Sequence, residues 1–310
     1  MFRLMKRFGR RWFLVVMIAH GAAVCRPLSS SYTVASYNLQ NYLLNSVDSR
    51  RAKSRESRAK VAAIIETIDA DILCLQEVGG VAALDRLRSD LVSLGLTYPY
   101  AVLVEGPDRV IQTALLSRFP IISFVPHTRT GYLIGGEWRL VSRGFGEALL
   151  EINQDYRVRI FWAHLKSKRE IYFPSQRTAR VEEALALRRM VESYLKQDEK
   201  TRLLVVGDLN DHPESGSVRI VLGNGRWAFE DVAPEAHRAA SDEFHRGNWT
   251  AYYSRDGSHN RFDYILASPG LKSQLDRDGC FIPMEADYSM ASDHRPIVAS
   301  FLIPSPDDSE

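Results

Sequence analysis

The amino-acid sequence predicts an α/β protein in which two β-sheets pack face to face with helices on their outer sides. Rounds of apolar strand and amphipathic helix are separated by a meander of short strands, a pattern typical of this class. The 310 residues are 45% hydrophobic and 25% charged, which is enough apolar material for a sizeable core. No linker, repeat or low-complexity stretch stands out, so we expect one domain over residues 31–303.

The first part of the domain alternates strands with helices. Residues 32–37 have the composition of a strand that ends at Asn38, and residues 71–76 form an apolar strand that leads into Glu77. Apolar residues spaced by three and four indicate a helix after each strand. These residues are Val61, Ile64, Ile65 and Ile68 in the first helix, and Leu84, Leu87, Leu91 and Leu94 in the second.

Short strands dominate the middle of the chain. Turn residues separate them, which favours antiparallel pairing. The last of these strands leads into His164, and a long helix over residues 175–197 follows it. The expected strands cover residues 101–105, 112–116, 121–125, 147–152 and 158–163.

The strand over residues 203–206 is the most informative element. Four consecutive apolar residues predict a strand buried on both faces, and Gly207 then lets the backbone turn. Asp208, Asn210 and Asp211 follow immediately, at the edge of an α/β sheet where ligands usually bind. Beyond a loop-rich region, strands are expected over residues 262–267 and 297–303 with a polar connection between them, and an acidic tail covers residues 304–310.

The N-terminus predicts export. Residues 1–25 combine five basic residues, a short apolar run and small residues, which is the pattern of a signal peptide. Arg10 and Arg11 also resemble a twin-arginine signal, with ordinary secretion as the alternative. In a bacterium the destination would be the periplasm or the exterior. In a less favoured interpretation the protein is a lipoprotein with Cys25 as the lipid-acceptor residue, which would bring membrane contact. Val24, directly before it, is bulkier than the small residues usual at such sites.

Charge and cysteine content restrict the function classes. Loss of the five basic residues in 1–25 changes the net charge from +2 to −3, so global charge gives no support for tight nucleic-acid binding. Cys74 lies in an apolar strand and Cys280 has no evident partner. A disulfide framework or a cysteine-based metal site is therefore not expected.

Asn, Asp, Glu and His residues recur next to the predicted strands: most follow a strand directly, one lies within a strand, and one pair precedes a strand. Each has a structural explanation taken singly, as a cap or a surface residue, but seven such positions, all filled by Asn, Asp, Glu or His, favour a shared site. The seven are Asn38, Glu77, His164, Asp208, Asn210, Asp263 and the pair Asp293-His294 counted as one position.

These residues lie in six motifs that occur in the order found in the endonuclease/exonuclease/phosphatase superfamily, which the sequence resembles over nearly the whole domain. The resemblance implies a DNase I-like four-layered sandwich of two packed mixed β-sheets flanked by helices. The motifs are Ser36-Tyr37-Asn38, Leu75-Gln76-Glu77-Val78, Ala163-His164-Leu165-Lys166-Ser167, Gly207-Asp208-Leu209-Asn210-Asp211, Phe262-Asp263-Tyr264-Ile265-Leu266 and Ser292-Asp293-His294-Arg295-Pro296.

The resemblance also implies a metal site. Glu77 would be the principal ligand, Asn38 would support it, and Asp293 would approach the same ion. Oxygen ligands favour Mg²⁺ or Mn²⁺, which would neutralise an anionic phosphodiester and leave positions open for substrate and water.

The remaining matched residues would perform the chemistry. Asp208 and Asn210 would orient the attacking water and a phosphate oxygen. His294 would contact the scissile phosphate with Asp263 bonded to its far nitrogen, and His164 would lie near the leaving group. Lys166 is a weaker expectation for substrate binding, with a solvated surface lysine as the alternative.

The expected activity is that of an exported, metal-dependent phosphoesterase, with a nuclease of low sequence specificity favoured and nucleic acid as its partner. The alternative substrates are a phospholipid headgroup or an inositol phosphate, although the sequence shows no long apolar hairpin for membrane insertion. Two rivals remain: a calcineurin-like metallophosphatase, whose further motifs are missing from the sequence, and a non-catalytic exported module on the same fold. No stable protein partner is implied, and a monomer is expected.

Overall fold

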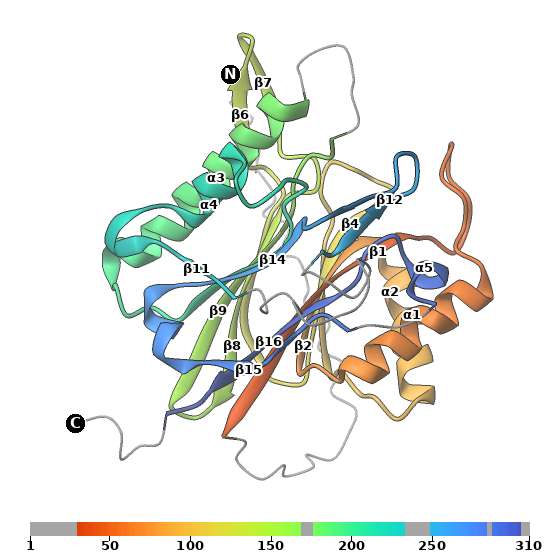
Figure 1. Cartoon of the computed structure of the whole chain (residues 1–310), viewed down its shortest axis with the longest axis horizontal. Helices are drawn as coiled ribbons and strands as arrows, with labels where there is room; N and C mark the ends of the chain where they lie inside the picture. The colour runs from red at the N-terminus through yellow and green to blue at the C-terminus, as the bar shows by residue number, and fades with distance from the viewer. Residues whose placement is uncertain (1–29, 169–175, 233–248, 284–286, 305–310) are drawn as a thin grey trace, which may run out of the picture.

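The computed structural model describes residues 30–168, 176–232, 249–283 and 287–304, in which two six-stranded β-sheets pack face to face (Figure 1). Helices cover the outer face of each sheet, so the predicted α/β sandwich is confirmed. The predicted signal peptide and residues 305–310 of the tail lie outside the described residues. Within the described ranges, no helix combines the length and hydrophobicity needed to cross a bilayer.

The first sheet contains the N-terminal and C-terminal strands. Its central strands β1 and β2 are parallel, and every other neighbouring pair in it is antiparallel. In spatial order it consists of β15 (Leu275–Phe281), β16 (Ile297–Leu302), β1 (Ser31–Tyr42), β2 (Ile72–Val78), β4 (Gln112–Ser117) and β3 (Tyr100–Val104).

The second sheet is built from the middle of the chain. Here β9 and β10 are parallel, and the remaining pairs are antiparallel, as expected for the short strands. In spatial order it consists of β11 (Glu230–Asp231), β14 (Asp263–Ala267), β10 (Leu203–Asp208), β9 (Tyr156–His164), β8 (Phe145–Asn153) and β5 (Ile121–His127).

Strand alternation divides the apolar residues among three clusters. In β10, for example, Leu204 and Val206 face the first sheet, whereas Leu203 and Val205 face α3 (Gln176–Gln197) and α4 (Gly216–Leu222). On the other side, α1 (Arg55–Ile68) and α2 (Val81–Ser93) pack on the outer face of the first sheet. The result is four layers with the central core between the sheets.

Several elements differ from the sequence prediction. Strand β1 continues to Tyr42 rather than ending at Asn38, because Gln40 and Asn41 adopt left-handed backbone conformations that form a bulge. The polar connection after residue 267 contains edge strand β15, together with the 3₁₀ helix η2 (Pro269–Gln274) and α5 (Tyr288–Ala291). The loop-rich region after Asp211 contains α4 and the 3₁₀ helix η1 (Gly225–Trp227).

Two hairpins were also missed. One is formed by β6 (Gly131–Ile134) and β7 (Glu137–Leu140), the other by β12 (Ala251–Tyr253) and β13 (Ser258–Asn260). In the first hairpin Leu133 and Trp138 are 62% and 66% exposed, so an apolar hairpin is present although it is short.

Candidate active site

The predicted site residues continue the inward-facing alternation of the core. Val34 in β1, Trp162 in β9 and Val206 in β10 all belong to the cluster between the sheets. Asn38, His164 and Asp208 follow at even intervals on the same strands, and Asp263 precedes the inward-facing Ile265 of β14 by two residues. The site is therefore the polar end of the core between the sheets.

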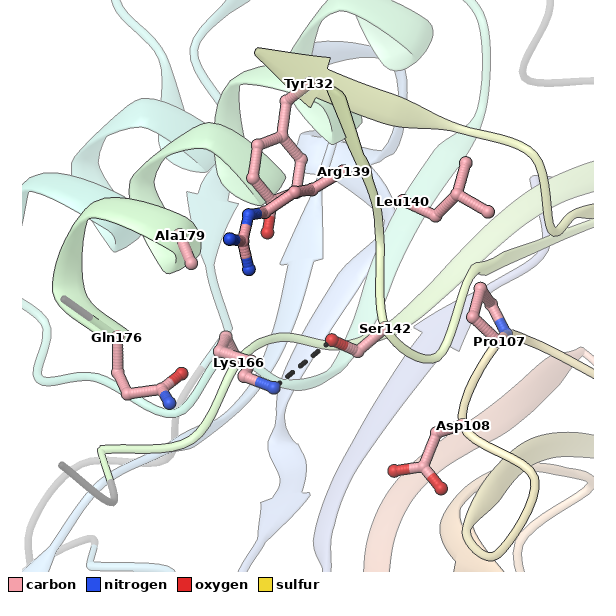
Figure 2. Close-up of a pocket in the computed structure, with 9 residues that line it drawn as sticks. All are labelled: Pro107, Asp108, Tyr132, Arg139, Leu140, Ser142, Lys166, Gln176 and Ala179. Atoms are coloured by element: carbon pink, nitrogen blue, oxygen red, sulfur yellow. Dashed lines mark hydrogen bonds between the residues drawn. The ribbon is translucent and has the colours of Figure 1, made fainter. Parts of the chain in front are cut away.

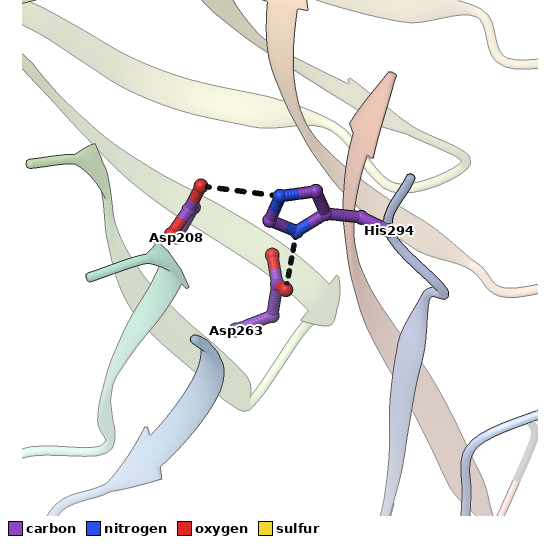
Figure 3. Close-up of side chains that lie close together, drawn as sticks. All are labelled: Asp208, Asp263 and His294. Carbon is purple, nitrogen blue, oxygen red and sulfur yellow. Dashed lines mark hydrogen bonds and ion pairs between the residues drawn. The ribbon is translucent and has the colours of Figure 1, made fainter. Parts of the chain in front are cut away.

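Sheet register brings three of these residues side by side. Asp208 is paired with His164 on parallel strand β9 and with Asp263 on antiparallel strand β14. His294 reaches the same point from the segment before β16. Ligand-type atoms of Asp208, Asp263 and His294 all lie within 4.8 Å of one another, and these side chains converge in Figure 3.

His294 and Asp263 make the contact that the resemblance implied. Nδ1 of His294 lies 2.7 Å from Oδ2 of Asp263. Burial disfavours a charged imidazole, but the carboxylates of Asp263, Asp208 and Asp293 outweigh burial and raise the pKa of His294 well above its ordinary value. His294 is therefore an imidazolium with Nε2 available as a donor.

Asp208 is held by donors on both oxygens. Nδ2 of Asn38 donates to Oδ2 at 2.9 Å, and the backbone N–H of Asn210 donates to Oδ1 at 2.8 Å. Burial and the neighbouring charge of Asp263 raise the pKa of Asp208 to about 7, although His294 works against them. The bond from Asn38 links the two sheets at the site.

His164 differs from His294 in charge. It is buried, and burial together with the positive charges of Arg143, His294 and Arg50 lowers its pKa well below the ordinary value. Its Nε2 lies 3.6 Å from Oδ2 of Asp208, and Nδ1 has no hydrogen-bond partner among the described residues. His164 is thus a neutral imidazole beside a carboxylate.

Asn210 has a left-handed backbone with φ 53°, which asparagine tolerates better than most residues. This conformation turns its N–H back onto Asp208, and its Nδ2 donates to the carbonyl of Leu165 at 2.9 Å. Asn210 thereby ties the segment after His164 to the segment after Asp208.

The predicted metal residues lie beside this group, on the first sheet. Glu77 has φ 61°, a strained conformation that interrupts strand alternation, and Oε2 accepts the backbone N–H of Asn41 at 2.8 Å. The amide oxygen of Asn38 accepts the N–H of Gln40 at 3.0 Å. The β1 bulge and the turn at Glu77 therefore support each other.

Lys53 lies within the electrostatic influence of both Glu77 and Asp293. Its Nζ donates to the carbonyl of Ala291 and to Oγ of Ser57, at 3.2 Å for the hydroxyl. Burial lowers the pKa of Lys53 to about 8, while the nearby carboxylates of Asp293 and Glu77 act in the opposite direction. Both predicted ligands therefore lie within electrostatic reach of one buried amine.

The donor chemistry fits a hard cation. Asn38, Glu77 and Asp293 supply one amide and two carboxylates, the oxygen ligands that Mg²⁺ and Mn²⁺ prefer. Asp208, Asp263 and His294 also bring ligand-type atoms within 4.8 Å of one another, but Nδ1 of His294 is bonded to Asp263 and its imidazolium form is a donor rather than a ligand. The residues present thus fit an ion on the Glu77 side and proton chemistry on the His294 side.

Supporting residues were missed by sequence reasoning. Oγ of Ser292 donates to the carbonyl of Asn38 at 2.7 Å and accepts the N–H of His294 at 3.0 Å. Oγ1 of Thr250 accepts the N–H of Asp263 at 3.1 Å. Ser292 adjoins the matched Asp-His pair, which was the available signal, whereas nothing in the sequence distinguishes Thr250 or Lys53.

Two further residues near the site differ in what they offer a ligand. Trp249 is buried, with its ring against Tyr288 and the Arg295 guanidinium 3.5 Å from its centroid, so it packs a loop rather than offering a stacking surface. Lys166 is only part-buried, lines a cavity, and its Nζ lies 3.4 Å from Oγ of Ser142.

The chain matches the model of the Endonuclease/Exonuclease/phosphatase family over residues 35–294. Because that match spans most of the chain, the protein belongs to this family. The resemblance carried by the six motifs is therefore confirmed, and a calcineurin-like phosphatase is excluded. No curated protein matches the sequence.

Solved structures share the fold. Truncated TDP2 from Caenorhabditis elegans is 22% identical, with 88% of this chain and 98% of that chain covered and a TM-score of 0.60. The catalytic domain of human Nocturnin is 18% identical, with 88% and 95% covered and a TM-score of 0.61. Sphingomyelinase C from Streptomyces griseocarneus is 16% identical, with 88% and 100% covered and a TM-score of 0.58. The protein thus has the fold of the phosphoester hydrolases of this family.

Proposed function

We propose that the protein hydrolyses phosphodiesters by in-line attack of water, and that nucleic acid cleaved with low sequence specificity is the favoured substrate. The convergence of Asp208, Asp263 and His294 at the polar end of the core is the observation that carries this proposal. A base, a charged donor and an orienting carboxylate are the groups that attack on a phosphodiester requires.

Each residue has a role that its surroundings support. Asp208 in its ionised form orients water and accepts its proton. His294 donates from Nε2 to a phosphoryl oxygen while Asp263 fixes its ring. His164 and Asn210 add neutral donors close to the scissile phosphate.

A divalent cation completes the proposed site. Glu77, with Asn38 and Asp293, would hold Mg²⁺ or Mn²⁺, which supplies positive charge against the negative phosphate when it is bound. A solved structure of beta toxin from Staphylococcus aureus, which shares the fold at a TM-score of 0.57, is described with bound magnesium ions.

A second candidate is a phospholipid-headgroup or inositol-phosphate phosphoesterase. The exposed Leu133 and Trp138 on the β6–β7 hairpin favour it, because apolar side chains of this kind bind membrane interfaces. The fold is shared with a sphingomyelinase C. A non-catalytic module on the same fold is the remote alternative. It is remote because every matched position carries the acid, amide or imidazole side chain that catalysis would need.

The cellular setting is proposed from the sequence. Residues 1–25 would direct export to the periplasm or the exterior of a bacterium, with a lipid anchor on Cys25 as the less favoured form. The protein would act as a monomer on its phosphoester substrate, without a stable protein partner. N-terminal sequencing of the protein recovered outside the cytoplasm tests export; an intact Met1 there would contradict signal cleavage.

Activity is tested by offering plasmid DNA, RNA, bis(p-nitrophenyl) phosphate, p-nitrophenyl phosphate and sphingomyelin side by side, with Mg²⁺ or Mn²⁺ and with a chelator. Hydrolysis of DNA, RNA and the generic diester that stops with chelator supports the proposed nuclease. Preferential hydrolysis of sphingomyelin supports the second candidate. No chelator-sensitive hydrolysis of any substrate would refute both.

A further inference from the structure

A cavity of about 520 Å³ lies beside Lys166, in the segment that follows His164. Its walls come from the β6–β7 hairpin, the first turn of α3 and the segments around residues 107–108 and 142, and Figure 2 shows the lining side chains. Lys166, which lines it, follows His164 by two residues, so their Cα atoms are at most ~7 Å apart. The cavity is therefore near enough to His164 for one substrate to reach both, and its volume is in the range of small-molecule sites, roughly 300–1,000 Å³.

The cavity has more positive than negative charge available to a ligand. Arg139 and Lys166 both line it. Nε of Arg139 has no hydrogen-bond partner among the described residues, and its pair with Glu137 is exposed and therefore weak. Among the described residues, Nζ of Lys166 makes one hydrogen bond, a long contact of 3.4 Å to Oγ of Ser142.

The acids near the cavity are already engaged. Asp108 lies on the wall, and its Oδ2 is 3.7 Å from Nε of Arg143, a buried arginine. Glu183 is fully buried, and its carboxylate accepts the backbone N–H groups of Ser142 and Lys166 at 3.2 and 2.7 Å. Asp108 and Glu183 act electrostatically on Lys166, but among the described residues neither forms an ion pair with Arg139 or Lys166.

We propose that this cavity is a second anion subsite, which binds a phosphate group of the substrate other than the one that is hydrolysed. The inference rests on the proposed function, because the cavity becomes a subsite only if a phosphodiester lies at His164. The guanidinium of Arg139, the ammonium of Lys166 and the hydroxyl of Ser142 are suitable donors to a phosphate. A choline headgroup does not suit it, because a quaternary ammonium is repelled by Arg139 and Lys166 and prefers aromatic faces.

The second phosphate has two chemical sources. It is either the neighbouring phosphate of a nucleic-acid strand or a phosphate on a small headgroup such as inositol. Two matched substrate pairs separate them: a thymidine dinucleotide with and without a 5′-phosphate, and glycerophosphoinositol with and without a 4-phosphate. The pair in which the added phosphate raises kcat/KM identifies the source.

The test compares the full-length wild type, Arg139→Gln and the control Arg157→Gln. Arg157 is also an exposed arginine paired with a glutamate, Glu151, but it lies at the opposite end of β9. In the wild type and the control, we expect the added phosphate to raise kcat/KM about tenfold or more in one pair. In Arg139→Gln this preference should fall to below about threefold. No preference in either pair, or a preference that survives in Arg139→Gln, would overturn the proposal.

Failure of the proposed function is recognised separately, because the wild type would then cleave neither member of either pair. In that case the subsite is tested by calorimetric titration of inorganic phosphate in the presence of chelator. Saturable binding by the wild type and Arg157→Gln that weakens at least about fivefold in Arg139→Gln supports the subsite. Equal binding by all three proteins, or none by the wild type, overturns it.

Discussion

At the scale of single residues, the site holds two buried histidines in opposite charge states. His294 faces the carboxylates of Asp263, Asp208 and Asp293, whereas His164 faces Arg143, His294 and Arg50. Because their environments shift the two pKa values in opposite directions, one site can provide both a charged and a neutral donor. The division of roles between the two histidines follows from their neighbours.

Asp263→Asn should lower kcat for bis(p-nitrophenyl) phosphate by about 10²-fold or more, because His294 loses the carboxylate that keeps it charged and oriented. The fold should be retained, since the substitution removes one of several clustered acids. Nitrogen NMR of His294 provides an independent readout, and its pKa should fall. A variant with wild-type kcat and an unchanged His294 titration would show that this pair is only structural.

Asp208 gives a pH prediction for stability in chelator. Its pKa is raised from 3.8 to about 7 in the folded protein, so the associated stability is present below about pH 4 and is lost as pH rises through about 7. Asp208→Asn removes this dependence. Urea unfolding should therefore show the variant gaining roughly 2–4 kcal/mol relative to wild type between pH 4 and pH 8. A difference that stays constant with pH would contradict the raised pKa.

Sequence reasoning identified residues that end or begin strands, because an apolar run marks where each strand delivers its next side chain. Asn38, His164 and Asp208 were found in this way. Lys53 and Arg143 were missed because a buried cation has no periodic signature in the sequence.

At the scale of elements, Asp211 joins three of them. Its Oδ2 accepts Nε of Arg180 from α3 at 3.0 Å and Oγ of Ser217 from α4 at 2.9 Å, and its carbonyl accepts the hydroxyl of Tyr264 from β14 at 2.7 Å. Burial opposes ionisation, but the hydrogen bonds from Lys168 and Ser217 and the charge of Arg180 lower the pKa of Asp211 to about 2. Asp211 shapes the turn after β10 and has no expected role in the site.

Asp211→Asn should destabilise the protein by about 3 kcal/mol at pH 6, because the buried Arg180 loses its ionised partner. A lowered pKa contributes stability above about pH 4 that is lost as pH falls through about 2, so the difference from wild type should shrink in that range. Glu151→Gln, which removes an exposed pair with Arg157, is the control and should cost less than about 1 kcal/mol by urea unfolding. A cost for Asp211→Asn no larger than the control would contradict this assignment.

The elements that sequence reasoning missed share a physical cause. Strand β15 reads Leu-Asp-Arg-Asp-Gly-Cys-Phe and lies at a sheet edge, where one side is solvated and polar residues are tolerated. The β6–β7 and β12–β13 strands have only three or four residues, too few to show a period. By contrast, the long α3 and the fully buried β10 were predicted within one or two residues.

At the scale of the whole molecule, the site depends on both sheets. The first sheet contributes Asn38 and Glu77 and the segment that carries His294, and the second contributes His164, Asp208 and Asp263. The contact between Asn38 and Asp208 spans the two sheets. No short segment could therefore reproduce the site, and its residues are adjacent only because both sheets end at the same edge.

A bound cation should stabilise this arrangement. At a concentration about 100-fold above its Kd, Mg²⁺ or Mn²⁺ should raise the Tm of the wild type by about 5–10 °C. Glu77→Gln should abolish the rise, whereas Glu66→Gln, an exposed glutamate on α1, should not. Thermal unfolding with and without chelator measures this, and an undiminished rise in Glu77→Gln would place the ion elsewhere.

The central claim is that Asp208 orients the attacking water in a phosphodiester hydrolase. The most direct measurement is the chelator-sensitive rate of bis(p-nitrophenyl) phosphate hydrolysis by the wild type and by Asp208→Ala, with circular dichroism as the check on folding. We predict a loss of about 10³-fold or more in a folded variant. A folded Asp208→Ala protein that retains the wild-type rate, or a wild type with no chelator-sensitive rate, would contradict the claim.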